Sequence, residues 1–514
     1  MVAHMPLHSD LSTFEDKLGR ERLVQDVARA IAVGQPPLVF GIHGDWGSGK
    51  TSFLCQLEHE LTGLCTNHPE AKDRKRHCEE IDNVFTVWFE AWRYQYEPAP
   101  VVALLQEICR QLPKHEKIKE NLKKWSAVLT KGIFGAIEEV SAEMTVGALG
   151  TGGKLGAKIK NPLQAIGAEA KAWNEDHLSG RLTTDRIREL LNETIEALLG
   201  DKGSRVCVLI DDLDRCEPVA ALRLLEGIKI HLSLPHCVFV LGVNLRQIEQ
   251  AIAPLLPGIA QTSDSAEKRA EAAEYLEKLC THVWKLPFPS RETRGHLLEL
   301  WLADPPQAPR DTIHVPPTLK QALVATATEY DCLPANPRKI KGLANTIRQL
   351  FHRGWPGAAP GKAHPVPADE TQAEADRLLV AASIDHFHSE LLRYLQTYPE
   401  AWDELIKWVN GKSALPAWSD LGCVLGDLRL SAAPRPAADY KATPSAEPLE
   451  LIFPDPVHVS VFRIHKLLRD ATAPSPPGRN SVTKQSLTRY LALAETPLKA
   501  APPPAAPAPP RAVA

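Results

Sequence analysis

A glycine-rich segment followed by lysine and threonine lies in the first tenth of the chain. Residues 44–51 fit the pattern G-x-x-x-x-G-K-[ST], directly after an apolar run at 38–42 and at the start of a helical pattern from about residue 50 to 61. In that context the loop can turn backbone N–H groups inward, and the helix N-terminus adds positive potential, so the segment can hold phosphates. The candidate nucleotide-binding residues are Gly44, Asp45, Trp46, Gly47, Ser48, Gly49, Lys50, Thr51 and Ser52.

A second segment supplies the carboxylates that such a phosphate site needs. Residues 206–212 read Val-Cys-Val-Leu-Ile-Asp-Asp, an apolar strand that ends in acids. We expect Lys50 to reach the β- and γ-phosphates, and Thr51 and Asp211 to bind Mg²⁺. The next carboxylate, Asp212, would orient or deprotonate the attacking water. Asp214 is a third acid; three such charges repel one another unless a cation or basic group neutralises them, and Asp214 could instead cap the following helix.

The elements that must position these residues follow from the hydrophobic pattern. Short apolar runs at 38–42, 84–89, 206–210 and 237–241 are separated by segments with helical spacing. This alternation predicts an α/β fold with a parallel sheet covered by helices. An amphipathic helix is predicted at the N-terminal end, beginning near residue 18, where Val24, Val27, Ala28 and Ile31 share one face.

Several longer strings together resemble the KAP family of P-loop NTPases. They are residues 44–52, residues 87–94 (Val-Trp-Phe-Glu-Ala-Trp-Arg-Tyr) and residues 210–218 (Ile-Asp-Asp-Leu-Asp-Arg-Cys-Glu-Pro). Two later strings agree, at 275–279 with 286–288 and at 336–341, so the resemblance covers roughly residues 10 to 350 in the family's order. It implies a P-loop sheet of the additional-strand type, with five parallel strands and a helical lid.

The resemblance also implies roles for residues outside the two motifs. Arg338 resembles a sensor arginine that faces the γ-phosphate from the lid, and Asn244 lies where a second polar sensor would end the fourth strand. The alternatives are a surface arginine on a helix and a helix N-cap, respectively. Leu18, Gly19 and Arg20 fall where relatives pack against the nucleotide base. Arg215, Arg246 or an arginine of a neighbouring protomer would complete the site.

The predicted division of the chain follows from these motifs and from its proline-rich joints. More than 100 residues separate the second and third predicted strands, which is too many for one crossover helix and indicates an insertion. We predict a nucleotide-binding core at 10–97 and 203–290, a large helical insertion at 98–202, a helical lid at 291–354, a linker at 355–369, a mostly helical C-terminal module at 370–498 and a disordered tail at 499–514.

Composition excludes some classes of protein. The 59 basic and 63 acidic side chains give a net charge of −4, so the positive field of a nucleic-acid binder is missing. Ten scattered cysteines and no secretory leader favour the cytoplasm. Charged residues interrupt every apolar stretch, which argues against a transmembrane segment. An interfacial helix at 133–140, and a zinc site formed by Cys55, His59, Cys65 and His68 with His77 and Cys78, stay as alternatives.

These observations predict an enzyme that binds ATP and Mg²⁺ and hydrolyses the nucleotide. The motifs contain no second active site that could use the products. Turnover is therefore expected to drive conformational switching and the assembly of protein partners. The motifs also allow an oligomer. The family resemblance points to bacterial defence against phage and to other defence components as partners. The alternatives are a non-catalytic scaffold stabilised by nucleotide, because Asp212 replaces a more usual glutamate, and a nucleic-acid motor.

Overall fold

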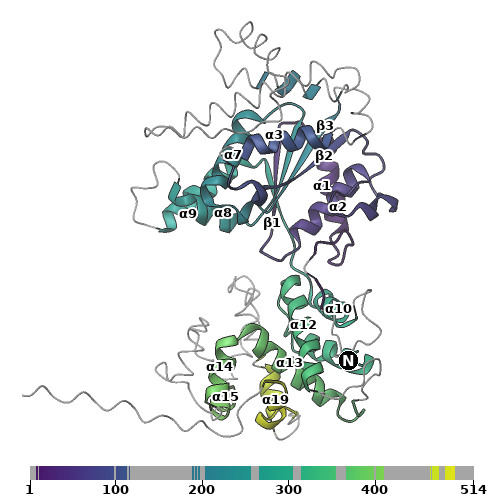
Figure 1. Cartoon of the computed structure of the whole chain (residues 1–514), viewed down its shortest axis with the longest axis vertical. Helices are drawn as coiled ribbons and strands as arrows, with labels where there is room; N and C mark the ends of the chain where they lie inside the picture. The colour runs from purple at the N-terminus through teal and green to yellow at the C-terminus, as the bar shows by residue number, and fades with distance from the viewer. Residues whose placement is uncertain are drawn as a thin grey trace, which may run out of the picture. The chain divides into compact units, whose positions relative to one another are not determined.

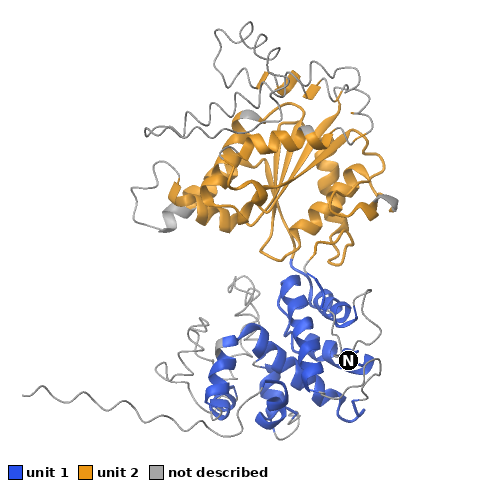
Figure 2. Ribbon diagram, viewed as in Figure 1, with its two compact units in different colours: residues 1–10, 288–514 blue, residues 11–287 orange. Residues whose placement is uncertain are grey.

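The computed structural model describes most of the chain outside the predicted insertion. The described residues are 7–9, 11–97, 100–112, scattered positions between 115 and 199, 203–255, 265–304, 314–354, 366–398, 401–409, 464–473 without 465, and 481–491. They form two compact units, residues 11–287 and residues 1–10 with 288–514 (Figure 2). Most of the predicted insertion, including the interfacial helix at 133–140, lies outside the described residues, as do most of the linker and the tail. The predicted domain boundaries stay predictions.

A five-stranded parallel sheet forms the centre of the unit 11–287 (Figure 1). Its strands are β1 (Leu38–His43), β2 (Val84–Glu90), β3 (Arg205–Asp211), β4 (Cys237–Val243) and β5 (His282–Lys285). Their order is β2-β3-β4-β1-β5, so β4 lies between β1 and β3. The four predicted strands are confirmed, and the α/β class with a parallel sheet is confirmed with them.

The fifth strand was not located from the sequence. β5 has only four residues, pairs with β1 alone, and leaves His282 and Lys285 exposed. Every residue of β4, in contrast, is buried, because helices cover both faces of the sheet there. A strand buried on both faces reads as an apolar run, whereas a short edge strand does not.

Helices cover the two faces of the sheet, and the alternation of side chains along each strand divides the core in two. On one face α1 (Glu21–Val33) and α2 (Lys50–Thr62) pack against residues such as Val240, and on the other face helices pack against Phe239. The second set is α3 (Pro100–Gln111), α7 (Pro218–His231), α8 (Leu245–Ile252) and α9 (Ser265–Leu279). The short 3₁₀ helices of this unit are η1 (Pro69–Asp73), η2 (Ala91–Tyr94), η5 (Leu213–Arg215) and η6 (Ala253–Leu255).

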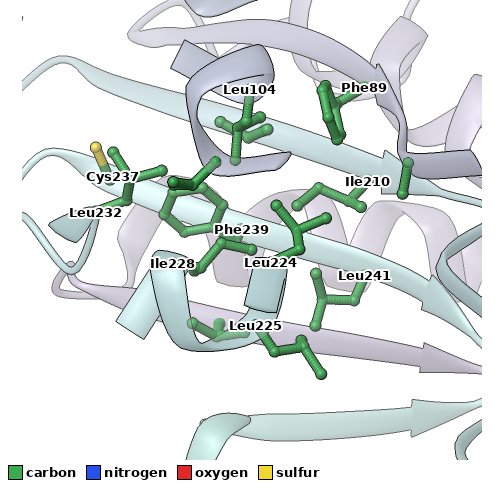
Figure 3. Close-up of a cluster of buried hydrophobic side chains, with 14 of the residues drawn as sticks. Phe89, Leu104, Ile210, Leu224, Leu225, Ile228, Leu232, Cys237, Phe239 and Leu241 are labelled. Carbon is green, nitrogen blue, oxygen red and sulfur yellow. The ribbon is translucent and has the colours of Figure 1, made fainter. Parts of the chain in front are cut away.

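The larger of the two apolar clusters anchors the central strands (Figure 3). Phe239 of β4 lies among Leu224 and Ile228 of α7, with Ile210 of β3 beside them (Figure 3). On the opposite face, α1 buries Val24, Val27, Ala28 and Ile31, the four positions that its periodicity predicted. The strand ends that carry the candidate site are therefore held by apolar packing from both sides.

The unit formed by residues 1–10 and 288–514 is helical in its described part. Its helices are α10 (Arg291–Leu302), α11 (Pro317–Glu329), α12 (Pro337–Gly354), α13 (Thr371–Phe387), α14 (Ser389–Thr397), α15 (Ala401–Val409) and α19 (Lys484–Leu491). α13 packs on α11, α12 and α19. The buried carboxylate of Glu374 on α13 accepts a hydrogen bond from Arg489 Nη2 at 2.8 Å, which ties α19 to α13. Within the described ranges, no helix combines the length and apolar character that crossing a bilayer requires.

Candidate functional site

The loop after β1 has a backbone that only glycine adopts easily. Gly47 and Gly49 have φ values of 84° and 93°, in the left-handed region, and a Cβ at Gly44 would lie 2.4 Å from Ser48 Oγ. α2 begins directly after Gly49, and no side chain caps its N-terminus. The first N–H groups of a 13-residue helix therefore face the loop without intrahelical acceptors, which is a site for an anion.

Lys50, the first residue of α2, is buried beside this loop. Its Nζ donates a hydrogen bond to Gly44 O at 3.1 Å and lies 3.1 Å from Asp214 Oδ2. The side chains of Lys50 and Asp214 are 8% and 5% exposed, so the pair is largely screened from water. The structure thus brings together the lysine of the first motif and the third acid of the second.

The three predicted carboxylates lie at the end of β3 and in η5, and each has a different environment. Asp212 adopts a left-handed backbone conformation, with φ 58°, and its Oδ1 lies 2.8 Å from Arg215 Nε. Asp214 pairs with Lys50, and the alternative that it caps the next helix is wrong, since Glu217 is the N-cap residue of α7. The expected repulsion is therefore relieved by one basic group for each of these two acids.

Asp211 is the carboxylate without a basic partner at ion-pair distance among the described residues. It is 2% exposed, and burial, followed by the charge of Asp212, raises its pKa to about 7. A hydrogen bond with the Thr51 side chain acts in the opposite direction. Its Oδ1 is buried and has no hydrogen-bond partner in the described part of the chain.

A carboxyl group that is hydrogen-bonded to a threonine side chain and has one unsatisfied oxygen is a donor set suited to a hard cation such as Mg²⁺. Gly242 on the neighbouring strand keeps the space open, because a Cβ there would approach Asp211 Oδ1 to 3.2 Å and Leu54 Cδ1 to 2.8 Å. The residues present therefore fit a divalent cation held by Thr51 and Asp211.

Asn244 follows β4 and faces the same edge of the sheet. Its backbone N donates a hydrogen bond to Asp214 Oδ2 at 3.0 Å. It occupies the N-cap position of α8, yet its side chain makes no capping hydrogen bond. Its Oδ1 is buried and has no partner among the described atoms, so this amide is available to a ligand or a water molecule.

Comparison with known proteins identifies the family. The model of the KAP family P-loop domain matches residues 20–351, which contain the sheet, the loop and the carboxylates. The chain belongs to the KAP family of P-loop NTPases. A P-loop NTPase domain binds a nucleotide, usually with a divalent cation, which agrees with the loop and with the Thr51–Asp211 pair.

Two relatives of this KAP protein are similar over part of its length. It is 22% identical to the "Phage T7 exclusion protein" of Escherichia coli (strain K12) over 352 residues, 66% of this chain and 42% of that relative. The chain therefore spans less than half the length of that protein. It is also 28% identical to an uncharacterized protein of Methanocaldococcus jannaschii over 162 residues, 28% of this chain and 83% of that relative.

Sequence reasoning missed how Arg20 acts on the KAP phosphate loop. Its Nη1 donates to Ser48 O and its Nη2 donates to Pro287 O, both at 2.7 Å. Burial lowers the pKa of Arg20 to about 10, against the effect of Asp16, so the guanidinium stays charged at neutral pH. Both acceptors are backbone carbonyls, which every residue type has. The sequence therefore did not predict these two hydrogen bonds of Arg20.

The other predicted site residues have different surroundings. Trp46 at the tip of the loop is 57% exposed, and the guanidinium carbon of Arg215 lies 5.7 Å from its ring centroid. Ser52 Oγ accepts a hydrogen bond from Thr13 N at 3.0 Å, which fixes the segment before α1. Arg338 is the second residue of α12, in the unit 288–514, and its role as a sensor stays a prediction.

The cysteines and histidines after the phosphate loop have partners of other kinds. Within the described ranges, no three side chains of His, Cys, Asp or Glu gather in a way that could hold a metal ion. His77 lies between Glu60 at 3.0 Å and Glu21 at 2.8 Å, and Glu60 also accepts the backbone N–H of Cys78. A hydrogen bond with the neighbouring thiol of Cys65, and then burial, raise the pKa of Cys55. These contacts pack the segment after α2 against α1 and α2 through hydrogen bonds and buried thiols.

His43 links the end of β1 to α8 through a hydrogen bond that requires a neutral ring. Its Nδ1 accepts a hydrogen bond from Leu245 N at 3.1 Å. Burial, and then Arg246 with other cations, lowers the pKa of His43, while Asp45 raises it. A lowered folded-state pKa contributes stability above the ordinary pKa of histidine, and that contribution is lost as pH falls below it.

We therefore predict that His43→Asn removes part of the acid sensitivity of this unit, because Asn Oδ1 accepts the same hydrogen bond at every pH. Between pH 7 and pH 5 the wild type should lose about 1 kcal/mol of unfolding free energy relative to the variant, the contribution of one hydrogen bond. Urea unfolding at a series of pH values measures this difference. Parallel stability curves for the two proteins would contradict it.

Proposed function

We propose that this KAP protein binds ATP with Mg²⁺ and hydrolyses it at the edge of the sheet formed by β1, β3 and β4. The observation that carries the proposal is the buried Asp211, whose side chain is hydrogen-bonded to Thr51 at the start of α2 and whose Oδ1 has no partner among the described residues. We assign the sheet to the additional-strand type that the family resemblance implies, because β4 lies between the loop strand and the carboxylate strand.

The residues of the loop would bind the phosphates. The N–H groups at the start of α2 face an anion, and Lys50 supplies a positive charge once it leaves Gly44 O and Asp214. Thr51 and Asp211 would hold Mg²⁺, which supplies charge stabilisation on the phosphate oxygens. Arg20 would keep the loop in shape, because its two hydrogen bonds tie Ser48 to the segment after β5.

Asp212 is our candidate for the residue that orients or deprotonates water. Its left-handed backbone turns the chain immediately after Asp211, and its carboxylate now pairs with Arg215. For catalysis this ion pair must open or shift, so that the carboxylate can accept a proton. Asn244, with its buried unsatisfied amide oxygen, would contact the attacking water or the γ-phosphate from β4.

The same ion pair favours a second candidate function. If Asp212 stays bound to Arg215 at 2.8 Å, nucleotide would bind without rapid turnover, and the protein would act as a nucleotide-stabilised scaffold for partners. The two functions differ in the rate of phosphate release and share the binding site.

The first test is steady-state phosphate release with Mg-ATP. We predict that Asp212→Asn lowers turnover at least about 100-fold while ATP binding persists, as expected for the loss of a general base. Lys50→Ala should weaken binding as well as turnover, because it removes the only lysine of the loop.

Glu217→Gln, an exposed residue near Asp212, is the matched control and should keep wild-type turnover. Equal inactivity of all four proteins, while the wild type still binds ATP, would favour the scaffold.

Substitution of Arg338 tests whether α12 contributes to the site during ATP hydrolysis. We propose that α10, α11 and α12 form a lid whose movement couples turnover to the assembly of protein partners or of an oligomer. Arg338→Ala is then predicted to slow hydrolysis about tenfold or more and to leave ATP affinity within twofold, because a sensor contacts the γ-phosphate mainly in the reacting state. Lys320→Ala on α11 controls for the lost charge. Unchanged turnover in Arg338→Ala would reject the sensor role.

Phage exclusion is the biological role that we propose. It is supported by the name of the E. coli relative, with 22% identity over 42% of that protein. We predict that T7 phage plates at least tenfold less efficiently on E. coli that expresses this chain than on cells with an empty vector. Cells that express Lys50→Ala should plate like the empty vector, since the role requires nucleotide. Equal plating on all three strains would contradict the defence role for this phage.

A further inference from the structure

One carboxylate at the edge of the sheet has no part in the reaction outlined above. Asp214 lies in η5, and its Oδ2 is both 3.1 Å from Lys50 Nζ and 3.0 Å from the backbone N of Asn244, which donates to it. A single oxygen atom therefore joins the lysine of the phosphate loop to the residue that follows β4. Neither side chain of the ion pair is more than 8% exposed.

Lys50 has two acceptors in the described structure, Gly44 O and Asp214 Oδ2. A buried ammonium needs a counter-charge, and the carboxylate of Asp214 provides it. The phosphates of a nucleotide are anions that require the same ammonium, so Asp214 and the nucleotide compete for Lys50. When Lys50 turns to the phosphates, Asp214 keeps the hydrogen bond from Asn244 N and remains in place.

We propose that Asp214 is an internal competitor for the nucleotide phosphates. It holds Lys50 in the nucleotide-free site, lowers the affinity for nucleotide and speeds the release of product. This inference rests on the proposed function of the same site, and it assigns Asp214 as a positioning residue that acts through Lys50.

Asp214→Asn tests this competition directly. The amide keeps the shape of the side chain and an oxygen for Asn244 N–H, but it removes the charge that holds Lys50. We expect the variant to bind Mg-ADP at least fivefold more tightly than the wild type in calorimetric titration. A purely structural role for Asp214 predicts equal or weaker binding. Glu217→Gln removes the same charge three positions away, at an exposed site, and should change affinity less than twofold.

A second measurement tests the ion pair without nucleotide. Lys50→Met should lower the thermal unfolding midpoint by several degrees, because it leaves a buried carboxylate without its counter-charge. Adding Asp214→Asn to Lys50→Met should restore at least half of that loss. Midpoints that fall by the sum of the two single effects would overturn the inference even if the single Asp214 variant folds poorly.

The outcomes separate this inference from the proposed function. Wild-type protein that binds neither Mg-ADP nor Mg-ATP overturns the proposed function and this inference with it. Wild-type protein that binds nucleotide, beside an Asp214→Asn variant that binds no more tightly, overturns this inference alone.

Discussion

Charge neutralisation at the carboxyl edge of an apolar sheet is the constraint on which the rest of the structure depends. Helices cover both faces of β3 and β4, so the acids that follow β3 stand at the boundary of a dry core. Asp212 is neutralised by Arg215 and Asp214 by Lys50, and Asp211 has a raised pKa beside Thr51. Each of the three carboxylates depends on a different neighbour. Removing one member of an ion pair leaves the other charge unpaired at a site with little access to water. The loop, the strand ends and the start of α2 therefore form one electrostatic unit.

Much of this fold could be predicted from the sequence, because its strongest signals are local. Buried parallel strands are apolar runs, α1 has a clear periodicity, and a glycine loop before a helix has a fixed pattern. These signals gave β1 to β4, the buried face of α1 and the position of the loop. β5 was missed because a short edge strand with exposed ends lacks an apolar run.

The site was harder to predict than the fold, since its contacts join residues that are far apart in the chain. The pairing of Lys50 with Asp214 depends on how closely the ends of β1 and β3 approach each other. The sequence had left open that Asp214 caps the next helix, but Glu217 holds that position. From the sequence, an N-cap position was one alternative for Asn244, and the residue occupies that position. The sequence did not predict that the Asn244 side chain makes no capping hydrogen bond, because this depends on the angle between β4 and α8. Arg20 binds two backbone carbonyls, and such acceptors have no signature in residue types.

The place of β4 between β1 and β3 has a consequence for how such a site tolerates sequence change. β4 pairs with both neighbours in a continuous register, so the backbones of β1, which precedes the phosphate loop, and of β3, which ends in Asp211, are held two strand spacings apart, about 10 Å. Backbone hydrogen bonds set that spacing, and they are made by every residue type except proline. Exchanges among apolar side chains that keep the packing against both faces of the sheet can therefore leave the two halves of the site in place. A relative that is only 22% identical over the 352 aligned residues can keep the same spacing, provided that small positions such as Gly242 stay small.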